Sequence, residues 1–348
     1  MPVIDADAHF PETPETWDFL DEADGRYRPV LVVKPEAGLV MWLVDTRDRG
    51  AITPAAKARL LNRPEPGADG ADYRRDVDAR LQAMDAAGVD VQVLFPSMFA
   101  EELTDKPEIE LALCRSYNRW MAEVSQHSKG RLRWMCALPL WSIPEAAAML
   151  SWCKERGAAG AMMRPMEVGN HLLHDPYFDP LYQALSDRNM CVGVHAGNGN
   201  PRHVDILRQG GPGSEDFWIN LIPLTGALHS VISCGVPERF PELRMGFFGA
   251  GSEWVSWAMK DLQRRGTPLP KNLFEAYRLY VCTRPWQDDF AHAVRYIGAA
   301  NLLAGSECGF FTRADSESLG TLKQDVPSNM TAALLDENAR RFYGISSD

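Results

Sequence analysis

Short runs of apolar, β-branched and aromatic residues recur along the chain, and longer segments with apolar residues at helical spacing separate them. Continuous apolar runs of this kind are typical of strands buried on both faces, whereas the longer segments predict amphipathic helices. The predicted strands are residues 3–9, 89–97, 132–140, 158–165, 190–197, 243–251, 279–285 and 301–309. The predicted helices are residues 76–88, 107–127, 144–157, 179–189, 253–265, 288–298 and 328–344.

This alternation predicts an α/β protein with a parallel sheet. Strands that are separated by helices pair in parallel through right-handed crossovers, and eight such units close into a (β/α)8 TIM barrel. An open doubly wound sheet is the alternative, but no GxGxxG motif follows the first predicted strand. We therefore expect one barrel domain over residues 1–348.

Two segments interrupt the alternation, at about residues 10–75 and 198–228. The first is rich in Pro, Gly and Arg around a short apolar piece, and the second is Gly- and Pro-rich before it turns helical. Each follows the end of a predicted strand, so each is expected at the C-terminal face, where barrels of this kind carry their active sites. We interpret them as lid insertions after strands one and five.

The composition and the net charge of the chain argue against nucleic acids and membranes as its partners. The chain is 45% hydrophobic and 24% charged, which is ordinary for a globular protein, and its net charge of −11 argues against nucleic acid. No apolar run has the length of a membrane span, and the first residues lack the pattern of a signal peptide. The seven cysteines include no CxxC pair, which favours reduced thiols and a cytoplasmic protein.

The first predicted strand carries an unusual polar pattern, VIDADAHF at residues 3–10. Asp5, Asp7 and His9 alternate, so in a strand their side chains point to the same face. Burying these polar groups is costly unless something pairs with them. Taken alone, the pattern fits a solvent-facing strand edge or the cap of a helix at residues 11–17 as well as it fits a functional site.

Two other strand ends resolve this ambiguity. His195 ends the fifth predicted strand and Glu307 ends the eighth. Singly, Asp7 fits a turn residue, His195 a core histidine and Glu307 a loop carboxylate. In a barrel, however, the ends of strands one, five and eight converge on one axis, and carboxylate and imidazole ligands together suit zinc or manganese. The sequence therefore favours a metal site at the barrel mouth.

Several blocks in a consistent order carry a resemblance to a known family. They include VIDADAH, DVDARLQAMDAAGVDVQVLFPS, HDPYFDPLYQALSDRNMCVGVHAG, IGAANLLAGSE and ENARRFYGI, and they cover nearly the whole chain. The chain resembles the amidohydrolase superfamily, in the amidohydrolase-related branch that contains aminocarboxymuconate-semialdehyde decarboxylase and γ-resorcylate decarboxylase.

The resemblance implies a set of metal ligands. Asp7 and His9 occupy the positions of the HxH-like motif of strand one, and Glu12 matches the nearby acid of its DxHxxE variant. His195 matches the metal histidine of strand five, and Glu307 stands where the family has Asp. The resemblance also implies one divalent ion, with zinc as the first expectation and manganese or another transition metal as alternatives, and a homodimer.

The chain also departs from the family at the position of its proton-transfer group. Decarboxylases of this branch carry a histidine after strand six, where this chain has Gly249 in FFGAGSEW. The candidates for acid–base work are therefore Glu307, His229 on the helix before strand six, and Glu253 just beyond Gly249. The last two also fit a structural histidine and an ordinary helix-start acid.

Three further residues are candidates for substrate binding. Arg164 ends strand four and can clamp a carboxylate, or pair instead with Glu167 or another lid acid. Trp286 and Phe310, which follow strands seven and eight, can cover a flat substrate or serve in packing.

We expect a metal-dependent enzyme that acts on a small aromatic or unsaturated acid, by hydrolysis or by nonoxidative decarboxylation. The alternative is a barrel with non-standard chemistry, either a metal-dependent redox or cyclisation enzyme or a catalytically inactive binding protein.

Overall fold

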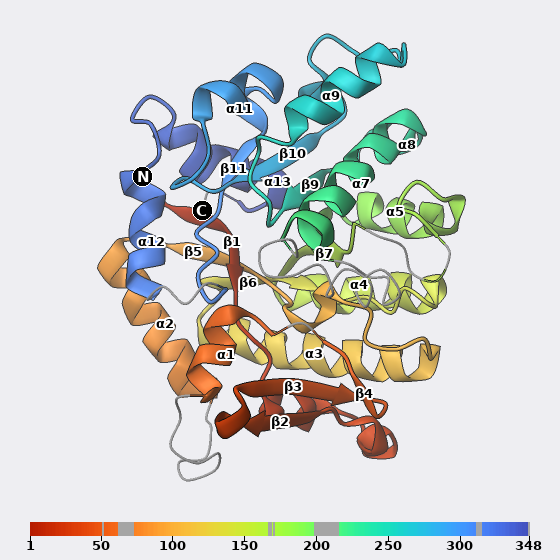
Figure 1. Ribbon diagram of the computed structural model, residues 1–348, viewed down its shortest axis with the longest axis vertical. Helices are drawn as coiled ribbons and strands as arrows, with labels where there is room; N and C mark the ends of the chain where they lie inside the picture. The colour runs from red at the N-terminus through yellow and green to blue at the C-terminus, as the bar shows by residue number, and fades with distance from the viewer. Residues whose placement is uncertain are drawn as a thin grey trace.

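Eight parallel strands form the centre of the computed structural model, which describes residues 1–50, 52–61, 73–165, 169, 171–197, 216–310 and 315–346 (Figure 1). Each predicted strand is confirmed, and their order in the sheet follows the chain. The strands are β1 (Ile4–His9), β5 (Val91–Phe95), β6 (Leu132–Cys136), β7 (Ala158–Met163), β8 (Cys191–His195), β9 (Met245–Phe248), β10 (Leu279–Thr283) and β11 (Leu302–Ala304).

The sheet closes on itself where β11 meets β1. Ala8 forms a parallel bridge with Cys308, and the His9 backbone N–H donates to the Cys308 carbonyl at 2.8 Å. The Glu307 N–H donates to the Asp7 carbonyl at the same distance. The expected (β/α)8 TIM barrel is therefore confirmed, and its closure brings the first and last strand ends into contact.

Helices surround the barrel, and the predicted helical segments are all helical in part or in full. The helices of the barrel wall are α2 (Tyr73–Ala87), α3 (Pro107–His127), α4 (Ile143–Glu155), α5 (Asp179–Asp187), α7 (Ile222–Ser233), α8 (Val236–Arg239), α9 (Val255–Arg264), α10 (Leu273–Ala276), α11 (Phe290–Tyr296), α12 (Asp315–Gln324) and α13 (Asn338–Tyr343). A π-helical turn, η9 (Ala333–Glu337), precedes α13. None of the described helices is both long enough and apolar enough to cross a bilayer.

The strands divide their side chains between two cores, as alternation along a strand requires. In β8, Val192 and Val194 face the helices, whereas Cys191 points into the barrel. The interior is filled by side chains such as Phe95 and Phe248, whose ring centroids lie 4.7 Å apart. Among the described residues, the interior of the barrel is thus a packed core.

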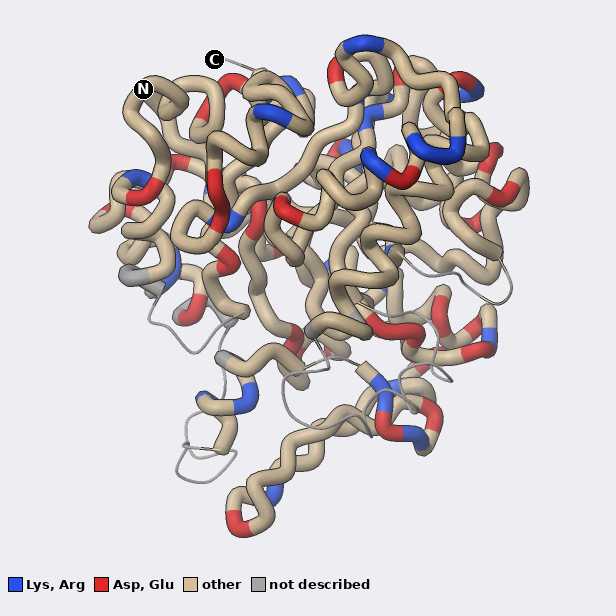
Figure 2. The backbone as a smooth tube through the Cα atoms, turned by 45° about the horizontal axis from the view of Figure 1, so that its top comes forward, with Lys and Arg blue, Asp and Glu red and all other residues tan. Residues whose placement is uncertain are grey.

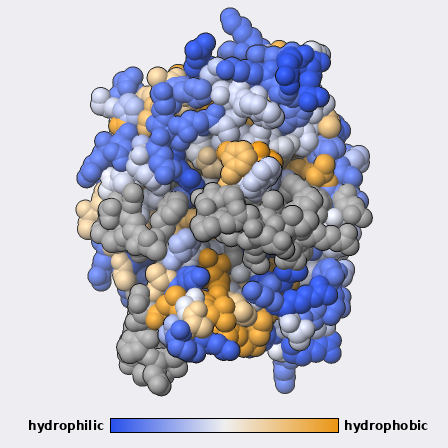
Figure 3. All heavy atoms as spheres, in the orientation of Figure 1, coloured by the Kyte–Doolittle hydropathy of each residue, from blue (hydrophilic) through white to orange (hydrophobic). Residues whose placement is uncertain are grey.

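The first insertion contains a small antiparallel sheet that the sequence did not predict. It comprises β2 (Val30–Lys34), β3 (Leu39–Val44) and β4 (Arg47–Asp48), and it precedes α1 (Pro54–Leu61). Short 3-10 helices, η1 (Pro14–Phe19) and η2 (Glu22–Tyr27), lead into it. Figure 2 shows the β2–β3 hairpin projecting from the body of the protein, and Figure 3 shows apolar side chains gathered over this sheet.

The second insertion is described only from η7 (Asp216–Leu221), which runs into α7. The helical end that we expected for this insertion is present, while residues 198–215 lie outside the described part of the chain.

Candidate metal centre

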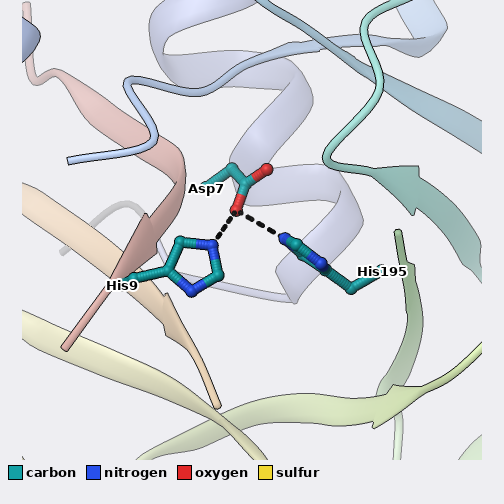
Figure 4. A group of neighbouring side chains, drawn as sticks. All are labelled: Asp7, His9 and His195. Atoms are coloured by element: carbon teal, nitrogen blue, oxygen red, sulfur yellow. Dashed lines mark ion pairs between the residues drawn. The ribbon is translucent and has the colours of Figure 1, made fainter. Parts of the chain in front are cut away.

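Three predicted ligands meet at the mouth of the barrel. Asp7 and His9 come from β1 and His195 from the end of β8, and their exposed fractions are 1%, 2% and 4%. Asp7 Oδ1 lies 3.6 Å from His195 Nε2 and 4.0 Å from His9 Nε2 (Figure 4). One ligand atom of each residue lies within 4.8 Å of the other two. Side chains that are far apart in the sequence therefore converge on one point.

The atoms that face this point have no hydrogen-bond partner among the described residues. They are Asp7 Oδ1, His9 Nε2 and His195 Nε2, and all three are buried. A buried polar atom without a partner is costly, and a cation shared by the three would satisfy all of them. One carboxylate and two imidazoles are the donor set that zinc and manganese accept. The residues present therefore fit a divalent metal ion.

The other nitrogen of each imidazole is held in place. The His195 Nδ1–H donates to the Ala196 carbonyl at 2.9 Å, and His9 Nδ1 lies 3.2 Å from Ser97 Oγ. A hydrogen bond at Nδ1 fixes the orientation of the ring and leaves Nε2 as the ligand atom. Both histidines are thus oriented toward the same point by partners behind them.

The two imidazoles differ in their electrostatic surroundings. Burial, with the nearby His195 and Arg80, lowers the pKa of His9 well below its usual value. Burial also disfavours the charged form of His195, but the Asp7 carboxylate and the Ala196 carbonyl outweigh it and raise the pKa of His195. Since coordination requires a neutral imidazole, His9 is already in the form that binds a metal.

Asp5 is a structural residue and does not belong to the cluster of Asp7, His9 and His195. Its carboxylate accepts hydrogen bonds from the Ser306 N–H at 2.8 Å and from Gln92 Nε2 at 2.7 Å. Burial raises the pKa of Asp5 to about 6. The pairing of β1 with β5 shifts register between Asp5 and Ala8. Through its hydrogen bond from Ser306, Asp5 anchors the segment that leads to Glu307.

Glu307 lies beside the cluster but is paired with an arginine. Its backbone has a φ of 47°, its side chain is buried, and its two carboxylate oxygens accept from Arg284 Nε and Nη2. Burial and the nearby Asp7 raise the pKa of Glu307, although Arg284 and His195 oppose this. Our sequence reasoning missed Arg284. Its signal was a basic residue directly after an apolar strand, in VCTRP.

Glu12, the expected acid of the DxHxxE-like pattern, is engaged elsewhere. Its two oxygens accept from the backbone N–H groups of Ser97 at 2.9 Å and of Met98 at 3.0 Å. Burial raises the pKa of Glu12 to about 7. Because Ser97 contacts His9, Glu12 supports the cluster from behind and does not join the three converging ligand atoms.

The structure does not bring His229 and Glu253 to the cluster. His229 lies on α7 with Nε2 3.2 Å from Asp261 Oδ2, in the contact between α7 and α9. Glu253 is exposed in the turn before α9. Neither belongs to the described residues that line the cavity at the barrel mouth. The geometry therefore favours Glu307 over these two as the acid–base group.

A cavity of about 110 Å³ opens onto the cluster. Its described wall includes His9, Ile52, Thr53, Ser97, Ala100, Glu101, His195, Ala196, Gly197, Asn220, Gly249, Glu307 and Phe310. Ile52 and Thr53 belong to the first insertion, and the Phe310 ring centroid lies 5.2 Å from that of His9. Trp286 is half-buried in the turn after β10 and is not among these wall residues.

Arg164 lies at the end of β7, close to the segment that forms part of this wall. Its Nη1 is 3.4 Å from the carbonyls of Phe99 and Glu101. Its Nε and Nη2 are buried and have no hydrogen-bond partner within the described chain. The alternative partner Glu167 lies outside the described residues.

The structure leaves no space for a side chain at Gly249, just after the sixth barrel strand, β9. A Cβ at this position would lie 2.8 Å from His195 Cε1 and 2.9 Å from Ala196 Cβ. Its φ of 83° is also one that residues with side chains rarely adopt. The backbone of β9 thus packs directly against the His195 ring.

The fold is an α/β barrel whose mouth carries one carboxylate and two imidazoles in an arrangement that fits a divalent metal ion, as in enzymes of the amidohydrolase type. The amidohydrolase family model matches residues 4–345, and the chain belongs to this family.

Solved structures of similar fold agree with this assignment. An amidohydrolase from Mycobacterium avium subsp. paratuberculosis K-10 has a TM-score of 0.77 at 19% identity, over 99% of this chain and 98% of that one. A 2,6-dihydroxybenzoate decarboxylase from Rhizobium has a TM-score of 0.69 at 17% identity, over 99% of both chains. A 5-carboxyvanillate decarboxylase from Novosphingobium aromaticivorans, complexed with manganese and 4-hydroxy-3-methoxy-5-nitrobenzoic acid, has a TM-score of 0.69 at 16% identity, over 99% of this chain and 96% of that one.

Proposed function

We propose that this protein is a metal-dependent enzyme that acts on a small aromatic or unsaturated acid, by nonoxidative decarboxylation or by hydrolysis. The observation that carries the proposal is the convergence of three buried ligand atoms from Asp7, His9 and His195 beside a small cavity, none of which has a hydrogen-bond partner among the described residues. These residues would hold one divalent ion, zinc or manganese. The manganese complex of a decarboxylase with the same fold supports the second choice.

The bound ion would supply positive charge that polarises a substrate oxygen or lowers the pKa of a water molecule. The protein's own part is to orient the ligands and to keep the site dry. Ser97 and the Ala196 carbonyl fix the two imidazole rings. Burial of all three ligands leaves the described cavity as the approach to them.

The walls of the cavity suit a flat, anionic molecule. Phe310 offers an aromatic face next to His9, and Asn220 adds a polar group. Arg164 is not among the described wall residues, and its charge opposes the rise in the pKa of Glu102 and of Glu110. Two of its buried N–H groups nevertheless have no hydrogen-bond partner within the described chain, and we propose that a carboxylate of a substrate that extends beyond the cavity accepts from them. A planar guanidinium is suited to this because it can hold both oxygens of a carboxylate at once.

Proton transfer is the proposed role of Glu307. Its buried carboxylate forms part of the cavity wall and lies close enough to Asp7 and His195 for their charges to affect its pKa. At a carbon or at a water molecule in the cavity, this carboxylate would accept or deliver the proton.

Decarboxylation is the favoured reaction, because two of the compared proteins of this fold are decarboxylases of aromatic acids. Hydrolysis is the second candidate, and one observation supports it. Gly249 leaves no space for a side chain where this branch of the family carries its proton-transfer histidine. A hydrolase would need only Glu307 as a base for water.

The first experiment measures metal content and its effect on stability. We expect about one zinc or manganese ion per chain, a lower melting temperature in chelator, and loss of both effects in the double variant D7A/H9A. The matched control is D78A/H127A, which removes an exposed Asp–His pair whose Nε2–Oδ1 distance is 2.9 Å. A wild-type protein that binds neither ion would overturn the proposal.

The second experiment measures turnover on a panel of hydroxybenzoates and unsaturated acids. Release of carbon dioxide would assign decarboxylation, and release of an acid and an alcohol or amine from their esters and amides would assign hydrolysis. Metal binding without turnover on either panel would instead support the binding-protein alternative.

A further inference from the structure

Arg284 is a charged residue at the barrel mouth to which no role has been assigned above. It follows β10 directly, and its side chain is 20% exposed. Its Nε donates to Glu307 Oε1, its Nη2 lies 3.4 Å from Glu307 Oε2, and Nη2 also donates to the Gly249 carbonyl. Its backbone N–H donates to Asp288 Oδ2 at 3.0 Å. The guanidinium is therefore held by residues that follow β9 and β11, the two strands on either side of β10.

This arrangement separates Glu307 from the other acid of the site. Asp7 Oδ1 has no hydrogen-bond partner among the described residues, whereas both oxygens of Glu307 accept from Arg284. The three ligand atoms that cluster belong to Asp7, His9 and His195, and Glu307 is not in that group. A charged, two-point hydrogen bond of this kind fixes the direction of a carboxylate as well as its charge.

The backbone at Glu307 adds a second restraint. Its φ of 47° is uncommon for a residue with a side chain, and the hydrogen bond from its N–H to the Asp7 carbonyl holds it there. The Gly249 carbonyl holds the guanidinium from the other side. Neither partner of the pair can therefore turn toward the cluster without breaking contacts elsewhere.

We propose that Arg284 is a positioning residue that holds the Glu307 carboxylate outside the set of metal ligands formed by Asp7, His9 and His195. This inference rests on the metal site proposed above. Arg284 neutralises one of the two acids at the mouth, so it weakens the attraction of the site for a cation. Because Glu307 is not used as a metal ligand, its carboxylate faces the cavity and is available for proton transfer.

The test compares the affinity of the metal-free protein for Mn²⁺ and for Zn²⁺ in two variants, by isothermal titration. In R284Q the Glu307 carboxylate is released and its charge is uncompensated, so we expect binding about fivefold tighter than in wild type. In E307Q the charge of Arg284 is uncompensated, so we expect binding about fivefold weaker. These opposite signs are the signature of the proposal, because a merely structural role would weaken binding in both variants.

R340Q is the matched control. Arg340 has a similarly buried side chain, 17% exposed, and an ion pair with Asp336 on the last turns of the chain. Its loss should leave the metal affinity unchanged. R284M repeats the test with an uncharged side chain of similar length, in case R284Q does not fold. If neither variant folds, Arg284 is a structural anchor and the proposal is wrong.

The outcomes separate this inference from the proposed function. A wild-type protein that binds neither ion contradicts the metal-dependent function itself. A wild-type protein that binds metal, together with an R284Q variant of equal or weaker affinity, overturns only the role of Arg284.

Discussion

At the scale of single residues, Asp7 and Glu307 are acids of the barrel mouth in different environments. Asp7 Oδ1 faces two imidazole nitrogens, whereas both oxygens of Glu307 face a guanidinium. Two carboxylates in different surroundings are suited to different roles, one as a ligand and the other as an acid or base. The roles that we propose for Asp7 and Glu307 therefore follow from the partners of each carboxylate.

Replacement of Glu307 by Gln tests its role in proton transfer. The amide keeps the shape but cannot accept a proton, so turnover on an identified substrate should fall about 10²- to 10⁴-fold. The free energy of unfolding should fall by only about 1–3 kcal/mol, through loss of the charged partner of Arg284. Glu307→Asp retains the charge and should retain part of the turnover. Full turnover in Glu307→Gln would rule out this role.

Glu110, at the start of α3, makes the stability of the protein depend on pH. Burial raises its pKa from 4.5 to about 7, although Arg164 and the Trp141 N–H oppose this. The folded protein therefore binds this proton more tightly than the unfolded chain, so Glu110's contribution to stability falls as pH rises from about 4.5 to 7.

Glu110→Gln should remove this loss. Relative to wild type, the variant should gain about 3 kcal/mol of unfolding free energy between pH 4.5 and pH 8. Urea unfolding at the two pH values measures this gain. Glu108→Gln, on the exposed side of the same helix turn, is the control and should show no such gain. An equal effect of Glu110→Gln at both pH values would contradict the prediction.

At the scale of elements, the site depends on contacts between the ends of neighbouring strands. The segment after β5 carries Ser97, which holds the His9 ring, and the turn η4 (Met98–Ala100), which forms part of the cavity wall. Glu12, just beyond β1, binds the backbone N–H groups of Ser97 and Met98. One side chain thus fixes the position of the neighbouring loop.

Glu12→Ala should therefore affect both stability and metal binding. Two buried N–H groups lose their acceptors, which should cost about 2–4 kcal/mol of unfolding free energy. Ser97 then holds His9 less firmly, so the affinity for Mn²⁺ should also fall. Urea unfolding and metal titration check the two effects, with the exposed Glu22→Ala as the control. An unchanged unfolding free energy would show that other contacts hold this loop.

At the scale of the whole molecule, closure of the barrel makes the site possible. Contacts between β11 and β1 bring Glu307 next to Asp7, and β8 carries His195 to the same opening. The first insertion adds Ile52 and Thr53 to the cavity wall, and Thr53 Oγ1 donates to the Gly309 carbonyl at 3.0 Å. The cavity is therefore built from segments spread along most of the chain.

The homodimer expected from the family resemblance stays a prediction. Several large apolar side chains on η7, α7 and α9 are exposed, among them Trp257 with an exposed fraction of 64%. Exposed large apolar side chains that form one patch often mark an interface. Sedimentation equilibrium at micromolar concentration should give a dimer, and a monomer would contradict the prediction. If this face forms the interface, Trp257→Glu should give monomers, whereas Val30→Glu, an exposed apolar control on β2, should not.

The sequence by itself determined the barrel and indicated where the proposed metal ligands lie. Buried parallel strands are continuous apolar runs, so all eight were recognisable, and Asp7, His9 and His195, which the structure brings together, stood out as polar residues at their ends. The antiparallel sheet of the first insertion was missed, although the alternation of buried and half-buried residues in β3 is its signal. Its short strands lie in a segment whose Pro and Gly content indicated a loop.

Only the tertiary structure decided which partner each polar side chain has. Glu307 was recognisable as a strand-end acid, but its pairing with Arg284 depends on how the ends of β10 and β11 lie together. Glu12 resembled a ligand, yet it binds backbone N–H groups that no residue pattern reveals. His229 and Glu253 are close to β9 in the sequence, but neither is among the described residues of the cavity wall. Periodicity determines the face of a side chain, whereas its partner depends on distances set by the closed barrel.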